Sequence, residues 1–259
     1  RLGGQVRLAA TATWRREIGG VTDWLGAEVH RLGVDVRLSV YADSDAVTEL
    51  RPDVVVIATG GVPDLEWLEG HEYCDSAWDI LNGSAKVRQM VLLYDGLGDH
   101  AAASCAEVLA GNGARVELAF RGRQAAERSG YCNYPVYIKH FYEMGIVLTP
   151  DRRLVKVEQS GQQLCSTFEN ELTGQIEERL TDQVVVEQGT VPLDDLYQAL
   201  KAGSCNNGYV DMDKLLSGQP QNLKNDRRDG YQLFRVGDAV SSRDIHCAIL
   251  DSRRLCKDL

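Results

Sequence analysis

Apolar positions along the chain follow two different periods, which predicts an α/β fold. Residues 17–32 carry apolar side chains at intervals of three and four and are followed by Gly33, as in an amphipathic helix that ends at a glycine. Residues 34–38 alternate apolar and polar positions, which predicts a half-buried strand. Residues 54–58 form a continuous apolar run after Pro52, which predicts a parallel strand buried on both faces.

A second strand, turn, helix and strand follow in order. Residues 90–95 predict a strand, residues 101–113 an alanine-rich helix and residues 114–120 another strand. The turn between the first two contains Gly96, Gly98 and the small Ala101. In a dinucleotide-binding fold these three positions make the turn, admit a pyrophosphate and let helix and strand pack closely. The spacing therefore predicts such a fold here, with NAD(P)H as the candidate ligand.

Two features argue against a nucleotide at this turn. Asp99 places a carboxylate where a pyrophosphate would approach the helix N-terminus, and like charges repel. The acid that would hold the ribose hydroxyls is also displaced, because Glu117 lies in mid-strand and Arg121 occupies the strand end. Arg121 suits a 2′-phosphate or no ligand. The sequence is therefore compatible both with a turn that binds NAD(P)H and with one that has lost this function.

The remaining segments predict a β meander and a closing strand and helix. Residues 147–148, 153–159, 163–170 and 183–189 predict strands separated by turns. Residues 231–259 read as a strand, a loop and a final helix. The glycine-containing turn Thr59, Gly60, Gly61 after the strand at 54–58 permits close approach of a ligand to the backbone, and so does Gly237 with Asp238 after the closing strand.

Other reactive side chains have simpler interpretations. His246 follows the last loop and either lies near a cofactor or caps the final helix. His140 is predicted to lie on a helix surface, and Asp194 with Asp195 to cap a helix. Four tyrosines in the same region are predicted to serve packing: Tyr131, Tyr134, Tyr137 and Tyr142. We find no candidate catalytic acid or base.

Composition narrows the class of protein. A formal charge of −10 and a pI near 5.0 argue against a nucleic-acid partner. No apolar run approaches the roughly 18 residues that cross a bilayer, so we expect a cytoplasmic protein without a membrane partner. The seven cysteines are scattered and never form a C-x-x-C pair, so we expect no metal site and interpret them as reduced, mostly buried thiols.

Six segments, in order and spanning nearly the whole chain, carry a family resemblance: 2–10, 18–37, 53–61, 169–174, 184–190 and 235–259. Together they resemble the C-terminal region of the trimethylamine dehydrogenase and 2,4-dienoyl-CoA reductase family, of the NADH:flavin oxidoreductase type. The resemblance is greatest to its dimethylglycine and N-methylproline demethylase-like branch.

The resemblance implies two nested, glutathione-reductase-like Rossmann-type domains behind a TIM barrel that holds FMN and a four-iron cluster. It assigns residues 1–84 to a flavin/ADP-type domain without its first βαβ unit, 85–190 to an inserted NAD(P)-like domain and 191–259 to the return of the first domain. Gly3, Gly4 and Gln5 would lie beside the ribose and phosphates of FAD or ADP. Residues 59–61 would pass beneath them, and residues 237–238 would complete the pocket.

Two functions from different classes follow. The first is the nucleotide-binding fragment of a flavin-dependent oxidoreductase, an amine dehydrogenase, N-demethylase or enoyl reductase, that binds FAD or ADP and, as a second candidate, NAD(P)H. The fragment alone is expected to be inactive. The second is a degenerate nucleotide fold that serves oligomer or electron-partner docking without an exchangeable cofactor. A truncated sheet would expose an edge, so a homo-oligomer is expected.

Overall fold

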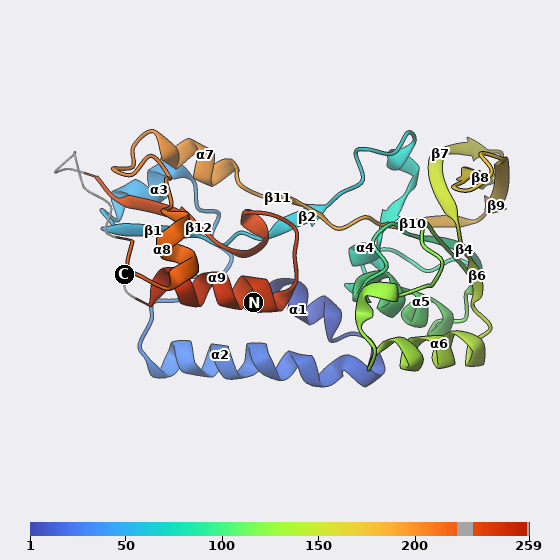
Figure 1. The fold of residues 1–259 in the computed structure, drawn as a ribbon, viewed down its shortest axis with the longest axis horizontal. Helices are drawn as coiled ribbons and strands as arrows, with labels where there is room; N and C mark the ends of the chain where they lie inside the picture. The colour runs from blue at the N-terminus through green and yellow to red at the C-terminus, as the bar shows by residue number, and fades with distance from the viewer. Residues whose placement is uncertain (222–229, 258) are drawn as a thin grey trace. The chain divides into compact units, whose positions relative to one another are not determined.

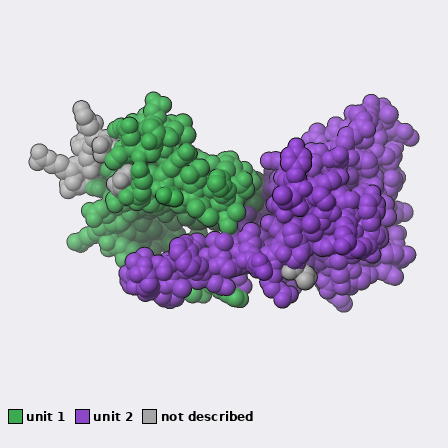
Figure 2. All heavy atoms as spheres, turned by 60° about the horizontal axis from the view of Figure 1, so that its bottom comes forward, with its two compact units in different colours: residues 1, 35–62, 190–259 green, residues 2–34, 63–189 purple. Residues whose placement is uncertain are grey.

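A computed structural model describes residues 1–221, 230–257 and 259. The chain divides into two compact units, which Figure 2 distinguishes by colour and which are described separately below. Unit 1 consists of Arg1, Asp35–Val62 and Thr190–Leu259, and unit 2 of Leu2–Val34 and Pro63–Gly189. In the described part of the chain, every helix is too short or too polar to cross a membrane.

A five-stranded parallel sheet forms the centre of unit 2. Its strands lie in the order β3 (Asp75–Ser76), β10 (Gln183–Glu187), β4 (Met90–Asp95), β5 (Arg115–Phe120) and β6 (Val147–Thr149). Successive side chains of a strand point to opposite faces. Val91 and Leu93 therefore join one hydrophobic cluster, while Leu92 and Tyr94 join another. The predicted strands at 90–95, 114–120, 147–148 and 183–189 are thus confirmed.

Each face of this sheet is covered by a different layer (Figure 1). The first cluster packs helices α4 (Ala77–Leu81), α5 (His100–Gly111) and α6 (Tyr134–Glu143) against one face. The second packs an antiparallel sheet against the other face. That sheet has the order β7 (Arg152–Ser160), β8 (Gln163–Asn170) and β9 (Ile176–Thr181). Both faces of the parallel strands are consequently buried, as their unbroken apolar runs predict.

The N-terminal segment of unit 2 is held by a buried acid. It contains α1 (Gly4–Ala9), the 3₁₀ helix η1 (Thr13–Ile18) and α2 (Gly19–Arg31). The indole N–H of Trp14 donates to the carboxylate of Glu107 on α5 at 3.1 Å, and Nδ1 of His140 lies 2.7 Å from the same carboxylate. His140 lies on a helix with its side chain 27% exposed, and in addition it contacts a buried acid, which the sequence did not indicate.

Unit 1 is built around two parallel strands, β1 (Val54–Ile57) and β12 (Gln232–Arg235). Their side chains again divide by period two, with Ile57 and Leu233 in one cluster and Phe234 in another. The surrounding elements are α3 (Ser44–Glu49), α7 (Asp195–Lys201), α8 (Met212–Ser217), η4 (Gly237–Ala239) and α9 (Ile245–Cys256). Short strands β2 (Gly61–Pro63) and β11 (Thr190–Pro192) pair with each other. The two further 3₁₀ helices, η2 (His71–Tyr73) and η3 (Glu127–Ser129), belong to unit 2.

Several local predictions are wrong. Residues 34–38 form no strand, because a ladder needs a neighbouring strand and none of the described strands pairs with this segment. Conversely, β9 (Ile176–Thr181) has no counterpart among the predicted strands, since half of its residues are charged. Of the tyrosines, Tyr137 is fully buried as expected, whereas Tyr131 and Tyr142 are 100% and 73% exposed.

The thiols also differ from expectation. Only Cys105 and Cys165 are buried among the seven cysteines, so the prediction of mostly buried thiols is wrong. Asp194 does occupy the N-cap position of α7, but its carboxylate binds the side chains of Gln198 and Arg235 instead of a helix amide. The domain boundaries proposed from the family resemblance, and the nesting of two Rossmann-type domains, stay predictions.

Truncation of a buried side chain in the central strand β4 should cause unit 2 to unfold at a lower denaturant concentration. Leu93 is fully buried in β4, so Leu93→Ala is expected to cost about 3 kcal/mol through lost burial and the remaining cavity. Urea titration followed by circular dichroism measures the change. The matched control is Leu180→Ala on β9, whose side chain is 51% exposed and whose loss should cost under about 1 kcal/mol. Equal losses in the two variants would contradict the assignment of the core.

Candidate nucleotide-binding turns

The first candidate site lies in unit 1, where β1 and β12 end side by side. The two strands are parallel, and their register pairs Ile57 with Arg235. The turns Thr59–Gly61 and Gly237–Asp238 therefore leave the sheet at the same edge. In open α/β sheets, ligands bind outside the carboxyl ends of the strands.

Backbone conformation explains the glycines at these turns. Gly60 and Gly237 have φ angles of +75° and +62°, which glycine adopts without steric cost. Gly61 has another reason, because a Cβ there would lie 2.7 Å from the carbonyl oxygen of Val191 and 2.8 Å from Thr190. The turn at 59–61 is thus packed tightly against β11.

Asp238 is held in a defined orientation. Its Oδ1 accepts a hydrogen bond from the backbone N–H of Arg243 at 3.1 Å, and its Oδ2 accepts one from the hydroxyl of Thr190 at 3.4 Å. The N–H of Thr190 in turn donates to the hydroxyl of Ser242 at 3.1 Å. A carboxylate fixed beside two glycine turns is able to accept hydrogen bonds from sugar hydroxyls.

The other residues predicted for this pocket lie elsewhere in the chain. Gly3 precedes α1, with a φ of +116°, and a Cβ on it would lie 2.8 Å from Cγ of Arg7. Gly4 and Gln5 form the first turn of α1, and all three belong to unit 2. Their sharing of a pocket with residues 59–61 stays a prediction.

His246 is the second residue of α9 and is exposed. It does not cap the helix, because the N-cap is Asp244, whose carboxylate accepts the N–H of Cys247 at 2.8 Å. That hydrogen bond is the main reason why the pKa of Asp244 is lowered. The cofactor-proximal role of His246 stays a prediction.

The second candidate site is a cavity of about 400 Å³ in unit 2, beside the turn between β4 and α5. Its wall includes Gly96 and Gly98 and, from the end of β5, Arg121. Ala101 lies one residue into α5 and is not among the lining residues. Three of the four predicted residues are thus brought together at one cavity.

Carboxylates of the protein itself accept hydrogen bonds from the backbone N–H groups of this turn. The carboxylate of Asp99 caps α5 by accepting the N–H of Ala101 at 2.9 Å. Oδ1 of Asp95 accepts the N–H groups of Leu97 and Gly98 at 3.1 and 2.7 Å. In a dinucleotide site, amides of the turn and of the helix N-terminus bind the pyrophosphate. Here these three already donate to carboxylates.

The space beside the glycines is also filled. A Cβ on Gly96 would lie 1.6 Å from Oε1 of Gln188, and one on Gly98 would lie 3.1 Å from Cγ of Glu127. A Cβ on Gly122 would lie 2.8 Å from Oε2 of the same glutamate. Gly96 and Gly98 thus admit close approach, as the sequence predicts, but to side chains of this chain.

Two buried carboxyl groups lie at the floor of the turn. Asp95 and Glu187 end the neighbouring strands β4 and β10 and pair in register, and they are 1% and 5% exposed. Burial raises the pKa of Asp95 to about 7 and that of Glu187 to about 8. The nearby carboxylate of Asp99 adds to both shifts. The floor of the turn is therefore acidic and poorly solvated.

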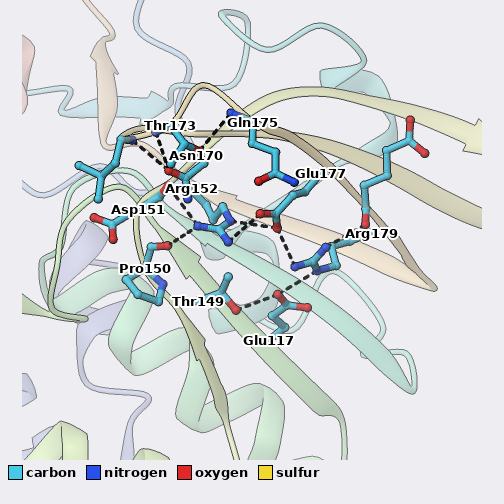
Figure 3. Close-up of polar contacts among 12 residues, drawn as sticks. Glu117, Thr149, Pro150, Asp151, Arg152, Asn170, Thr173, Gln175, Glu177 and Arg179 are labelled. Atoms are coloured by element: carbon cyan, nitrogen blue, oxygen red, sulfur yellow. Dashed lines mark hydrogen bonds and ion pairs between the residues drawn. The ribbon is translucent and has the colours of Figure 1, made fainter.

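The two residues weighed for ribose recognition are both engaged. Nε of Arg121 donates to Oε1 of Glu171 at 2.6 Å. Glu117 accepts the hydroxyl of Thr149 at 2.8 Å and lies 3.4 Å from Nε of Arg179 (Figure 3). In the same network Arg179 also binds Glu177 of β9, which is bound in turn by Arg152 of β7. Glu117 therefore ties the parallel sheet to the antiparallel one.

Sequence reasoning missed three residues that line this cavity, namely Asp95, Glu127 and Glu171, and also Gln188, whose side chain lies against Gly96. The position of Asp95 could have been noticed in the sequence, since it ends a predicted strand directly before the first glycine of the turn. The other three come from segments distant in sequence, and no motif indicates them.

Comparison of the sequence with those of known proteins identifies the family of the chain. No family model matches the chain. It is 42% identical over 258 residues to a probable N-methylproline demethylase of Rhizobium meliloti, a match that covers 99% of the chain and 38% of that protein. It is 41% identical to an N,N-dimethylglycine/sarcosine dehydrogenase of Chromohalobacter salexigens, covering 100% of the chain and 39% of that protein. The resemblance to the trimethylamine dehydrogenase and 2,4-dienoyl-CoA reductase family is confirmed.

The chain spans about two fifths of the length of these relatives. Solved structures agree in fold. A 6-hydroxypseudooxynicotine amine oxidase from Pseudomonas geniculata N1 superposes with a TM-score of 0.80 at 20% identity, over 98% of this chain and 36% of that one. A thioredoxin reductase of T. acidophilum gives a TM-score of 0.55 at 16% identity, over 80% of this chain and 64% of that one. The chain is therefore part of an oxidoreductase family, and its mixed α/β architecture is shared with reductases of the thioredoxin reductase type.

Asp95→Asn is expected to stabilise the fold more at pH 8 than at pH 5. An unfolded aspartate titrates near pH 4, whereas burial raises the pKa of folded Asp95 to about 7. The folded chain holds the proton longer, so the stability of the wild type falls as the pH rises between these values. Asparagine retains an Oδ1 acceptor and loses no proton. The difference in free energy of unfolding should grow to at most about 4 kcal/mol at pH 8.

Urea unfolding at the two pH values measures this difference. Asp213→Asn, at an exposed position in α8, is the matched control and should show no such dependence. A stability change in Asp95→Asn that is the same at pH 5 and pH 8 would argue against a carboxyl group that is protonated in the fold.

Proposed function

We propose that the chain is the nucleotide-binding part of a flavin-dependent oxidoreductase, and that unit 1 binds the adenine nucleotide portion of FAD or ADP at the turns 59–61 and 237–238. The parent activity we assign is oxidation of an N-methylated amine or reduction of an enoyl group. The relatives support the first of these, since they are named as a demethylase and a dimethylglycine/sarcosine dehydrogenase.

The observation that carries this proposal is the pair of turns at one sheet edge. Parallel neighbours β1 and β12 each run into a turn with a glycine at positive φ, and Asp238 stands beside the second of them. Glycine turns let a phosphate approach the backbone closely, and the carboxylate is the group that binds ribose hydroxyls in dinucleotide folds. Both parts of a nucleotide thus have a partner of suitable chemistry.

Flavin supplies the hydride chemistry in such enzymes, and the protein supplies binding and orientation. We assign FMN and the four-iron cluster to the barrel that the family resemblance implies. In unit 1, the residues 59–61 and Gly237 would hold the phosphates and Asp238 the sugar. A homo-oligomer stays a prediction.

ADP and FAD are expected to raise the melting temperature of the protein, because a ligand of the native state stabilises it. Asp238→Asn should weaken ADP binding about tenfold by removing a charged acceptor from the ribose hydroxyls. Isothermal titration calorimetry with ADP measures the affinity. Asp213→Asn, an exposed change in the same unit, should bind like the wild type. The proposal would be overturned if the wild type bound neither ADP nor FAD.

A second function is favoured by the cavity in unit 2: a nucleotide fold whose own turn is closed. Asp95 and Asp99 occupy three amides of the turn, and Gln188 and Glu127 fill the space beside its glycines. A pyrophosphate would have to displace these carboxylates and then face their charge. We propose that this unit serves structure or partner contacts and binds no NAD(P)H.

NADH and NADPH are accordingly expected to leave the melting temperature unchanged at millimolar concentration. Differential scanning fluorimetry checks this with the protein that is used for ADP. The proposal would be contradicted if NADPH raised the melting temperature of the wild type but not that of Arg121→Ala. That result would indicate a functional NADPH site in which Arg121 binds the 2′-phosphate.

A further inference from the structure

We propose that the cavity beside the Gly96–Gly98 turn binds an organic ammonium ion, with N–H groups directed to Asp95 and an alkyl chain against the apolar part of the wall. This site is separate from the nucleotide site proposed for unit 1 and does not depend on it. This cavity combines a negative charge, an unsatisfied acceptor and an apolar wall.

The charge of the cavity is negative. Its lining includes four acidic side chains and one basic one, namely Asp95, Glu127, Asp151, Glu171 and Arg121. Two of the acids are compensated, because Arg121 binds Glu171 and Arg123 binds Asp151. No ion pair joins either Asp95 or Glu127 to a cation within the described residues. These two lie close enough for the charge of Glu127 to raise the pKa of Asp95.

One residue that lines the cavity carries an acceptor without a donor. Oδ1 of Asp95 takes two turn amides, but its Oδ2 is buried and has no hydrogen-bond partner in the described part of the chain. A buried acceptor without a donor costs on the order of the desolvation of that group. A phosphate brings further acceptors, whereas an ammonium group brings donors and the opposite charge.

The rest of the wall suits a carbon chain. Leu97, Phe120 and Leu172 line the same cavity, and Phe120 is only 3% exposed. A volume of about 400 Å³ falls in the usual range of small-molecule sites. A cavity with a carboxylate at its floor and apolar side chains on its wall matches an alkylammonium ion better than a bare inorganic cation.

The test uses butylammonium chloride with the whole chain at pH 8, followed by isothermal titration calorimetry. Butyltrimethylammonium has the same charge and alkyl chain but no N–H donor, and should bind at least about tenfold more weakly because it leaves Asp95 Oδ2 without a donor. Potassium chloride at the same concentration should produce no binding heat. Equal affinity for all three cations, or no binding of butylammonium, would overturn the proposal.

Two variants locate the site. Asp95→Asn keeps the acceptor for the turn amides and should abolish the preference for butylammonium over butyltrimethylammonium. Glu127→Gln changes an exposed side chain, so it should fold normally and weaken binding several-fold through loss of charge. The matched control is Glu72→Gln, whose side chain is 61% exposed outside the cavity, and it should bind like the wild type. Unchanged binding in both cavity variants would place the ligand elsewhere.

The pH profile gives an independent readout. Asp99 and Glu127 face Asp95 from the turn and from η3, and their charges act with burial to raise the pKa of Asp95. Glu187 of β10 pairs in register with Asp95, whose charge adds to the raised pKa of Glu187. Butylammonium should therefore bind more tightly at pH 8 than at pH 6, as the carboxyl group loses its proton. The same affinity at both pH values would count against Asp95 as the ligand.

Discussion

Burial of the parallel strands on both faces is the constraint on which the whole structure depends. In β4, Leu93 packs into the helical layer while Leu92 packs into the antiparallel sheet. Unit 1 repeats this division between Ile57 and Phe234. Strands buried in this way expose polar backbone only at their ends, so the turns at the carboxyl edges are the places where a ligand can meet the backbone.

The two units use that edge in different ways. In unit 1 the turns after β1 and β12 keep their glycines at positive φ, with Asp238 fixed beside them. In unit 2 the equivalent turn is closed by Asp95 and Asp99, which accept its amides. Glycine turns at strand ends thus form the nucleotide site proposed for unit 1 and the acidic cavity of unit 2. The fold alone does not decide between these uses, because the side chains at the turn do.

Much of the architecture could be predicted from the sequence, since long apolar runs such as 54–58 and 90–95 report burial on both faces directly. The segment 34–38 shows the limit of this reasoning, because alternation describes a strand only if another strand lies beside it. At the candidate sites, the glycines at 96 and 98 were predicted, but the side chains that fill the space beside them were not. Gln188 and Glu127 come from distant segments, and their approach depends on tertiary structure.

Strand β9 illustrates how one property can have two effects. Because of its charged residues Glu177, Glu178 and Arg179, the strand lacks the apolar alternation by which strands are predicted. Glu177 and Arg179 also bind neighbouring side chains (Figure 3). β9 is also the outer strand of the three-stranded sheet, with one row of backbone groups unpaired within that sheet. Charged side chains on such a border oppose the addition of a strand from another molecule. The feature that hides this strand from pattern analysis also protects the protein against aggregation through its sheet.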